Sequence, residues 1–131
     1  MKVIYILEDN PEQLKALTAI CRRLGYKVFA YTTSNDLEGN IDVSHDILCF
    51  MLDLSLKETK NGFQVAEKIV REKNIPVTKF LFITGWKPQF EAIKPDIFSN
   101  NIIINKANWT KEELIHALKS IDTEINSQEN A

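Results

Sequence analysis

Short apolar runs alternate along the chain with segments in which apolar residues recur every three or four positions. The apolar runs predict five strands, at residues 3–7, 27–33, 46–54, about 79–84 and 102–105. The segments between them, and the one after the last run, have the spacing of helices that bury one face. Strands that alternate with helices in this way are typical of an α/β fold built on a parallel sheet.

Local signals mark the ends of the first helices. Asn10 is a predicted N-cap with Pro11 at the first helical position, and Gly25 is predicted to end that helix. Residues 34–40 leave room for only a short second helix. A third helix is predicted to begin near residues 61–62, where Asn and Gly stand together.

The second half of the chain is less regular before its last helix. Pro88 and Pro95 limit any helix within residues 86–101 to about two turns. A capping box at residues 110–113 predicts the start of the last helix. We expect residues 126–131 to form a polar, frayed C-terminal tail.

Length and composition favour one domain, predicted to span residues 1–125. A chain of 131 residues can bury a sufficient core without a disulfide or a metal. The net charge of −2 predicts no nucleic-acid or anionic-lipid partner, and the first apolar run is too short for a signal peptide or a membrane span. Cys21 and Cys49 fall in apolar segments, so we expect reduced core residues of a cytoplasmic protein rather than a disulfide.

Polar residues follow four of the five predicted strands. Glu8 and Asp9 follow the first, Asp53 ends the third, Thr84 closes the fourth and Lys106 follows the fifth. In an open parallel sheet, ligands bind at the carboxyl ends of the strands, so we expect these side chains to lie together. Each residue alone has an ordinary alternative: helix capping for the acidic pair, a turn for Asp53 and Thr84, and a surface charge for Lys106.

Together, these residues suit phosphoryl chemistry with a divalent cation. Three carboxylates offer the hard oxygen ligands that Mg²⁺ prefers, and a cation relieves the repulsion between them. Asp53 is the predicted nucleophile, which would form an aspartyl phosphate. Lys106 and the Thr84 hydroxyl would then stabilise the charge on the phosphoryl oxygens, and Gly85 would leave space for the group to enter.

Over about residues 2–125 the sequence resembles the receiver domain of two-component response regulators. The matching pieces are residues 4–10, 46–47, 52–54, Gly62-Phe63, 82–85 and Lys106. The resemblance implies a flavodoxin-like, doubly wound, five-stranded parallel sheet of order 2-1-3-4-5 with helices on both faces. It also implies that Asp53 accepts a phosphoryl group from the phosphohistidine of a histidine kinase or phosphotransfer protein. The backbone carbonyl of Ser55 would be a further Mg²⁺ ligand.

Four features depart from the family pattern. Ala107 stands where the family has a proline joined by a cis bond, so the peptide bond after Lys106 is either strained or trans with a rearranged loop. Ile103 replaces an aromatic residue that rotates inward on activation. The loop at residues 55–61 lacks the usual proline and carries one extra residue, and Pro95 interrupts the fourth helix.

Three functions remain open from the sequence. The first is a phosphoacceptor domain, not an enzyme beyond its own phosphotransfer and dephosphorylation, that signals by contact with an unknown downstream protein. The second is a receiver-like interaction module that works without phosphorylation. The third is a phosphohydrolase with an aspartyl nucleophile, although such enzymes of the haloacid-dehalogenase type place a second Asp where this chain has Ser55.

Overall fold

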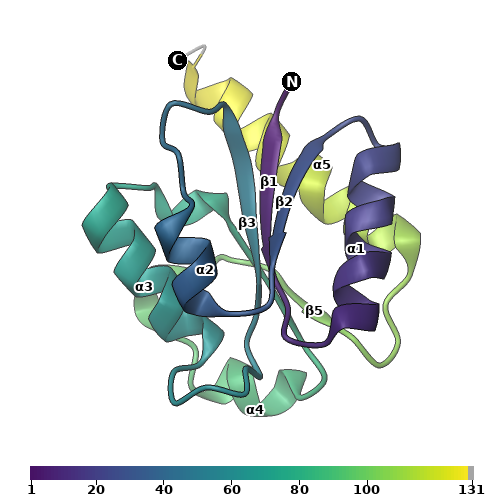
Figure 1. Ribbon diagram of the computed structural model, residues 1–131, viewed down its shortest axis with the longest axis vertical. Helices are drawn as coiled ribbons and strands as arrows, with labels where there is room; N and C mark the ends of the chain where they lie inside the picture. Colours follow the sequence, from purple (N-terminus) through teal and green to yellow (C-terminus); the bar gives the residue numbers. More distant parts are fainter. Residues whose placement is uncertain (130–131) are drawn as a thin grey trace.

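The computed structural model describes the backbone of residues 1–129 and the side chains of residues 1–122. Five parallel strands form one sheet of order β2-β1-β3-β4-β5 (Figure 1), which confirms the predicted flavodoxin-like topology. The strands are Val3–Leu7 (β1), Lys27–Tyr31 (β2), Ile47–Asp53 (β3), Phe80–Thr84 (β4) and Ile103–Asn105 (β5). Both ends of each strand lie within two residues of the predicted bounds.

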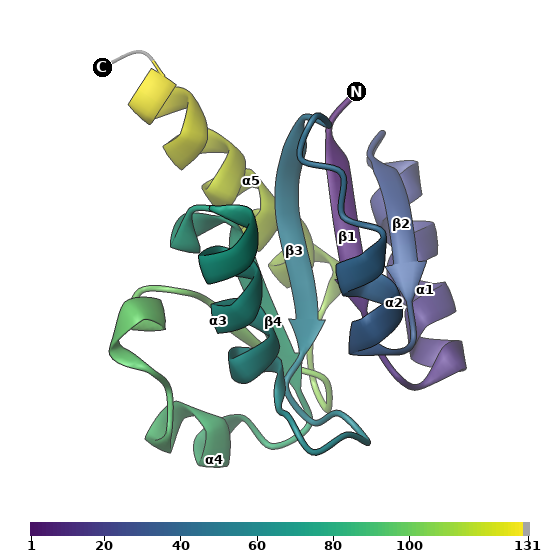
Figure 2. The ribbon, with the colours of Figure 1, turned by 60° about the vertical axis from the view of Figure 1, so that its left-hand side comes forward.

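Helices cover both faces of the sheet, as predicted (Figures 1 and 2). They are Pro11–Arg23 (α1), Ser34–Gly39 (α2), Gly62–Lys73 (α3), Lys87–Ala92 (α4) and Lys111–Glu129 (α5), with 3-10 turns at Val77–Lys79 and Asp96–Phe98. One apolar cluster joins the sheet to α1 and α5. A second joins the other face to α2 and α3, and includes Phe98. The core therefore lies in two layers with the sheet between them.

The central strands are buried along their whole length. Every residue of β1, β3 and β4 is buried, which agrees with their continuous apolar sequences. On the face that α2 and α3 cover, rings on four neighbouring strands stand in a row. Tyr5 stacks on Phe29 and on Phe50, with ring centroids 5.4 and 5.1 Å apart, and Phe50 stacks on Phe80 at 5.1 Å. These residues are also direct register partners across the strands.

The predicted caps are present where the structure describes them. The Asn10 side chain accepts hydrogen bonds from the backbone N–H groups of Glu12 and Gln13, and the Thr110 hydroxyl accepts one from Glu113. Gly25 follows α1 with a φ of +94°, a conformation that favours glycine. Helices α1 and α5 thus start with their exposed N–H groups partly satisfied.

The chain between β4 and β5 is irregular, as the two prolines predicted. Helix α4 has six residues with Pro88 near its start, and Pro95 precedes the 3-10 turn at Asp96–Phe98. Helix α5 is longer than expected and runs to Glu129, past the predicted domain end at residue 125. The predicted tail contains no Pro or Gly, and each added helical residue gains a backbone hydrogen bond. Residues 130–131 of that tail lie outside the described residues.

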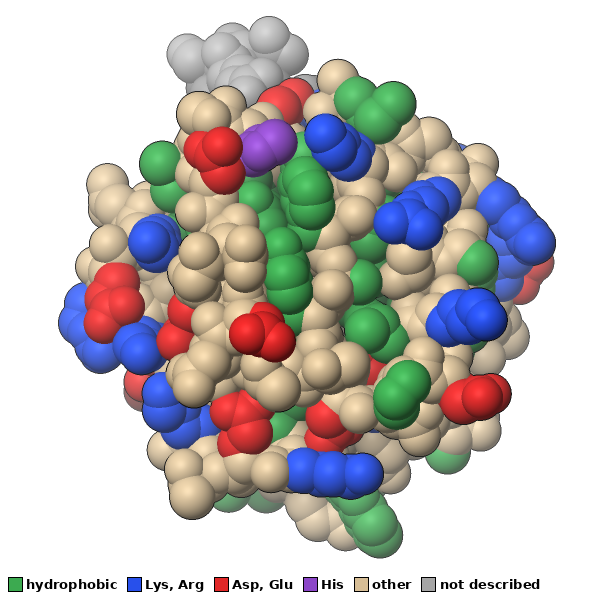
Figure 3. All heavy atoms as spheres, viewed as in Figure 1, with side chains coloured by type: hydrophobic (Ala, Val, Ile, Leu, Met, Phe, Trp, Pro, Cys, Tyr) green, Lys and Arg blue, Asp and Glu red, His purple; other side chains and the backbone are tan. Residues whose placement is uncertain are grey.

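Two further predictions concern the cysteines and the surface. Cys21 and Cys49 are free and buried, as predicted, and burial raises the pKa of the Cys21 thiol to about 12. Lysine, arginine and carboxylate side chains are interspersed on the face drawn in Figure 3, so neither sign of charge dominates that face. None of the described helices has the length and apolar character needed to cross a membrane.

Candidate functional site: an acidic cluster at the strand ends

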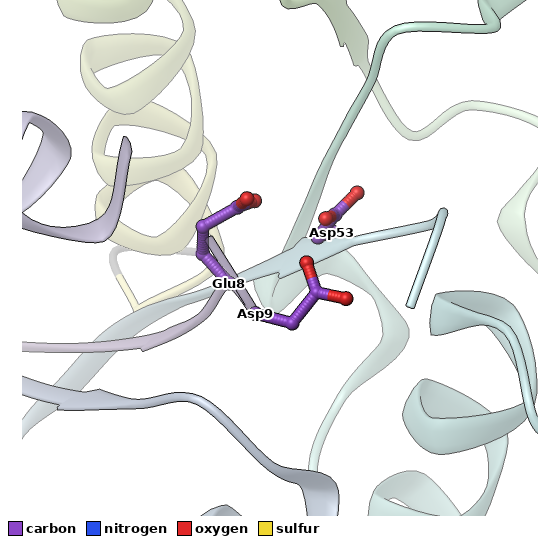
Figure 4. Close-up of side chains that lie close together, drawn as sticks. All are labelled: Glu8, Asp9 and Asp53. Atoms are coloured by element: carbon purple, nitrogen blue, oxygen red, sulfur yellow. The ribbon is translucent and has the colours of Figure 1, made fainter. Parts of the chain in front are cut away.

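Three carboxylates gather where β1 and β3 end (Figure 4). Glu8, Asp9 and Asp53 each place an oxygen so that all three atoms lie within 4.8 Å of one another. Glu8 and Asp53 are fully buried, whereas Asp9 is partly exposed. The parallel register of β1 and β3 brings these acids together across 44 residues of sequence, as the strand-end argument predicted.

The Lys106 ammonium joins two of these acids. Its Nζ donates to Glu8 Oε1 and to Asp53 Oδ2, each at 2.9 Å. Backbone pairing explains the placement, because the N–H of Lys106 donates to the carbonyl of Thr84 at the ends of β5 and β4. One lysine thus compensates part of the charge of three acids, and an excess of negative charge remains.

Burial dominates the electrostatics of Glu8. It raises the pKa of this carboxyl group to about 7, with Asp53 acting in the same direction and the hydrogen bond from Lys106 opposing both. Burial alone would lower the pKa of Lys106, but its hydrogen bonds to Glu8 and Asp53 raise the pKa above the usual value. The lysine therefore stays charged beside the acids at neutral pH.

The Thr84 hydroxyl lies in the same network through Ser55. Its Oγ1 is 2.9 Å from the Ser55 hydroxyl and accepts a hydrogen bond from the backbone N–H of Trp86 at 3.1 Å. The Ser55 N–H donates to Asp53 Oδ1 at 2.9 Å. Thr84 is buried, while Trp86 is 61% exposed. The family resemblance implies a ligand role for the Ser55 carbonyl, and the structure adds the contacts of its N–H and hydroxyl.

The peptide bond between Lys106 and Ala107 is trans. Of the two alternatives that the sequence left open, the structure therefore adopts the trans bond. The N–H of Ala107 donates to Asn105 Oδ1 at 2.9 Å. A proline has no N–H and could not make this hydrogen bond. The bond therefore depends on Ala107 standing in place of the proline.

Gly62 permits a close approach of α3 to the acceptor strand. A Cβ atom on Gly62 would lie 2.4 Å from the backbone oxygen of Asp53 and 3.0 Å from the Cα of Leu54. Because the neighbours are backbone atoms, they cannot turn away as a side chain could. The sequence marked Gly62 as the start of a helix, but gave no sign of this contact. By contrast, a Cβ on Gly85 would meet no atom within 4 Å.

The loop between β3 and α3 also reaches the site. The N–H of Lys57 donates to Asp9 Oδ2 at 2.7 Å. The adjacent Glu58 accepts hydrogen bonds from the N–H and the hydroxyl of Ser34, at the start of α2. No periodicity or spacing in the sequence pointed to these contacts, because they depend on the path of an irregular loop.

The acidic cluster fits a Mg²⁺ ion. Its donors are carboxylate oxygens, which are the hard ligands that this ion takes. Glu8 Oε2 is buried without a hydrogen bond, although it lies 2.8 Å from the Lys106 ammonium as an ion pair. A buried carboxylate oxygen that lacks a hydrogen bond is costly when the group is ionised, and a cation near the three acids would lower that cost.

Many of the similar solved structures are response regulators or their receiver domains. TrrA from Thermotoga maritima, solved in complex with Mg²⁺ and BeF, is 18% identical with a TM-score of 0.74, covering 92% of this chain and 99% of that one. The HemR receiver domain from Leptospira biflexa is 24% identical with a TM-score of 0.71, covering 92% and 94%. A response regulator receiver domain from Clostridium thermocellum is 15% identical with a TM-score of 0.79, covering 98% and 99%. At these identities the likeness shows the fold.

Sequence comparison identifies the family. No curated protein matches the sequence. The family model for the response regulator receiver domain, however, matches residues 4–119. That match spans most of the chain and includes the carboxyl ends of β1, β3, β4 and β5, where the site residues lie. The chain therefore belongs to the response regulator receiver domain family.

Proposed function

We propose that this receiver domain accepts a phosphoryl group on Asp53 and signals through contact with another protein. The observation that carries the proposal is the surroundings of the Asp53 carboxylate. One oxygen accepts from Lys106, the other accepts from the Ser55 N–H, and two further acids lie beside it. A nucleophile, a fixed cation and a set of hard ligands are thus within reach of one phosphoryl group.

The proposed reaction transfers the group from a phosphohistidine. A carboxylate oxygen of Asp53 attacks the phosphorus, the phosphorus–nitrogen bond breaks, and the imidazole leaves with the bonding electrons. Lys106 then shifts its hydrogen bond from the carboxylate to a phosphoryl oxygen, and the Thr84 hydroxyl donates to another. Glu8, Asp9, Asp53 and the Ser55 carbonyl would hold Mg²⁺, which supplies positive charge against the phosphoryl oxygens when it is bound.

The partners follow from this chemistry. The donor would be a histidine kinase or a phosphotransfer protein, and the recipient of the signal would be a downstream protein of unknown identity. The two buried thiols fit a reducing compartment, so we place the domain in the cytoplasm. The mixed surface charge supports protein contact rather than nucleic-acid binding.

Intact mass after incubation with acetyl phosphate and Mg²⁺ tests the proposal. The protein should gain one phosphoryl mass, and Asp53→Asn should abolish the gain. Asp36→Asn is a matched control, because Asp36 is an exposed acid on α2 outside the acidic site. Labelling that persists in Asp53→Asn, or that is lost in Asp36→Asn, would contradict the assignment of Asp53.

A phosphate-independent interaction module is the second candidate. Ile103 stands where the family has an aromatic residue, so this position has no ring that could rotate inward. Its side chain is only 2% exposed and lies in the same core cluster as Phe82 and Phe98. Failure of the parent protein to gain a phosphoryl mass at saturating Mg²⁺ would favour this candidate. Repeated turnover of a small phosphate ester would instead support a phosphohydrolase, for which Ser55 supplies no carboxylic acid.

A further inference from the structure

The loop between β3 and α3 connects the acidic site to the first turn of α2. Two consecutive residues make the connection: the N–H of Lys57 donates to Asp9 Oδ2 at 2.7 Å, and the Glu58 carboxylate accepts from Ser34. In Figure 2 this loop extends across the end of the sheet on the side of α2. Lys57 and Glu58 thus connect Asp9 to Ser34 through two neighbouring residues of one loop.

The hydrogen bonds between Glu58 and Ser34 satisfy a buried backbone group that has no acceptor within its own helix. Ser34 is 1% exposed, and its N–H belongs to the first turn of α2, where no carbonyl of the same helix can accept it. Glu58 accepts both this N–H, at 3.0 Å, and the Ser34 hydroxyl. Both hydrogen bonds go to an ionised group, which makes them stronger than neutral ones. Although Glu58 is an exposed residue, its carboxylate is hydrogen-bonded to the buried Ser34.

The two ends of the loop have anchors of their own. Leu54 accepts a hydrogen bond from the N–H of Gly62, and Asn61 exchanges hydrogen bonds with Gln64 in the capping box of α3. Glu58 lies between these anchors, in the stretch that carries the extra residue. The position of the Lys57 N–H, and therefore the orientation of the Asp9 carboxylate, depends on the middle of the loop.

We propose that Glu58 is a positioning residue for the cation site. By fastening the loop to Ser34, it holds the Lys57 N–H against one oxygen of Asp9 and leaves the other oxygen to face a divalent cation. The inference rests on the Mg²⁺ site of the proposed function, and it adds that Mg²⁺ affinity depends on a residue that does not contact the ion. It also links the cation site to the start of α2.

A Mg²⁺ titration without phosphodonor, followed by NMR or calorimetry, tests the proposal. Glu58→Ala should weaken Mg²⁺ binding by about three- to tenfold, the range expected from losing about one net hydrogen bond. Glu58→Gln keeps an acceptor oxygen and should show a smaller loss. Glu38→Gln is the matched control, because Glu38 on α2 pairs with Lys68 on α3 and lies outside the acidic cluster. It should bind Mg²⁺ like the parent protein.

Two further measurements separate positioning from a purely structural role. Hydrogen exchange should show faster exchange at the amides of Lys57 and Ser34 in Glu58→Ala, while the thermal unfolding temperature stays close to that of the parent. In the acetyl phosphate reaction, the half-saturating Mg²⁺ concentration should rise, and the rate at saturating Mg²⁺ should stay the same. Unchanged Mg²⁺ affinity in Glu58→Ala, or an equal loss in Glu38→Gln, would overturn the inference.

The results also separate this inference from the proposed function. Weaker Mg²⁺ binding in Glu58→Ala together with a parent protein that gains no phosphoryl mass would sustain the inference and refute phosphorylation. A parent protein labelled on Asp53, with a Mg²⁺ requirement that Glu58→Ala leaves unchanged, would refute the inference alone. A parent protein that binds no Mg²⁺ would refute the inference and the Mg²⁺-dependent reaction together.

Discussion

Replacing Gly62 with Ala should displace the backbone of Asp53 and Leu54 at the end of β3. The added Cβ would lie 2.4 Å from the Asp53 oxygen, 3.0 Å from the Asp53 carbonyl carbon and 3.0 Å from the Leu54 Cα. Inserting a methyl group into such a contact costs about 1–3 kcal/mol. Against this, Ala is favoured over Gly in a helix interior by at most about 1 kcal/mol, and Gly62 is only the first residue of α3. The clash should therefore dominate.

Denaturant unfolding and the rate of labelling measure the two consequences. We expect Gly62→Ala to lose about 1–3 kcal/mol of unfolding free energy, which corresponds to a drop of several degrees in unfolding temperature for a domain of this length. Because the displaced carbonyl belongs to Asp53 itself, the rate of phosphorylation should also fall. Gly39→Ala is the control, since a Cβ there meets no atom within 4 Å. If Gly62→Ala unfolds and reacts like Gly39→Ala, the close contact does not constrain the site.

Two other substitutions test the roles assigned around Asp53. Asp9→Ala should weaken Mg²⁺ binding in calorimetry more than Glu8→Ala does, because Glu8 already accepts a hydrogen bond from Lys106 while Asp9 is partly exposed. Equal Mg²⁺ affinities in both variants and the parent would exclude this ranking. Trp86→Ala should shorten the lifetime of the aspartyl phosphate about tenfold, if the indole adds roughly 1.4 kcal/mol to the barrier by blocking the attacking water. Since Trp86 is 61% exposed, stability should hardly change, and an unaltered lifetime would show that the indole does not shield the site.

The strands and the acidic cluster could be predicted because both depend on simple patterns. Continuous apolar runs located the buried strands, and a parallel sheet places the residues after those runs at one edge. Glu8, Asp53 and Lys106 therefore meet as expected, with hydrogen bonds of 2.9 Å. Their roles in phosphoryl transfer are predictions that the labelling of Asp53→Asn tests.

The features that the sequence did not reveal depend on how irregular segments run. The contacts of Lys57 and Glu58 join residues 24 to 48 positions apart through a loop without periodicity. The trans bond before Ala107 was one of two alternatives, and the hydrogen bond to Asn105 accompanies it. Helix α5 passed its predicted end because no helix-breaking residue stops it, whereas Pro95 did interrupt the region before β5 as expected.

The row of stacked rings helps to fix the register of the strands that carry the site residues. Glu8 follows Tyr5 by three residues, Asp53 follows Phe50 by three, and Thr84 follows Phe80 by four. A slip of one residue between two strands would turn these rings to the opposite face, so the stack opposes any slip. Stacked aromatic rings in the core thus help to fix the relative positions of the acids at the strand ends. The loops around the site can then change in length without moving those acids relative to one another.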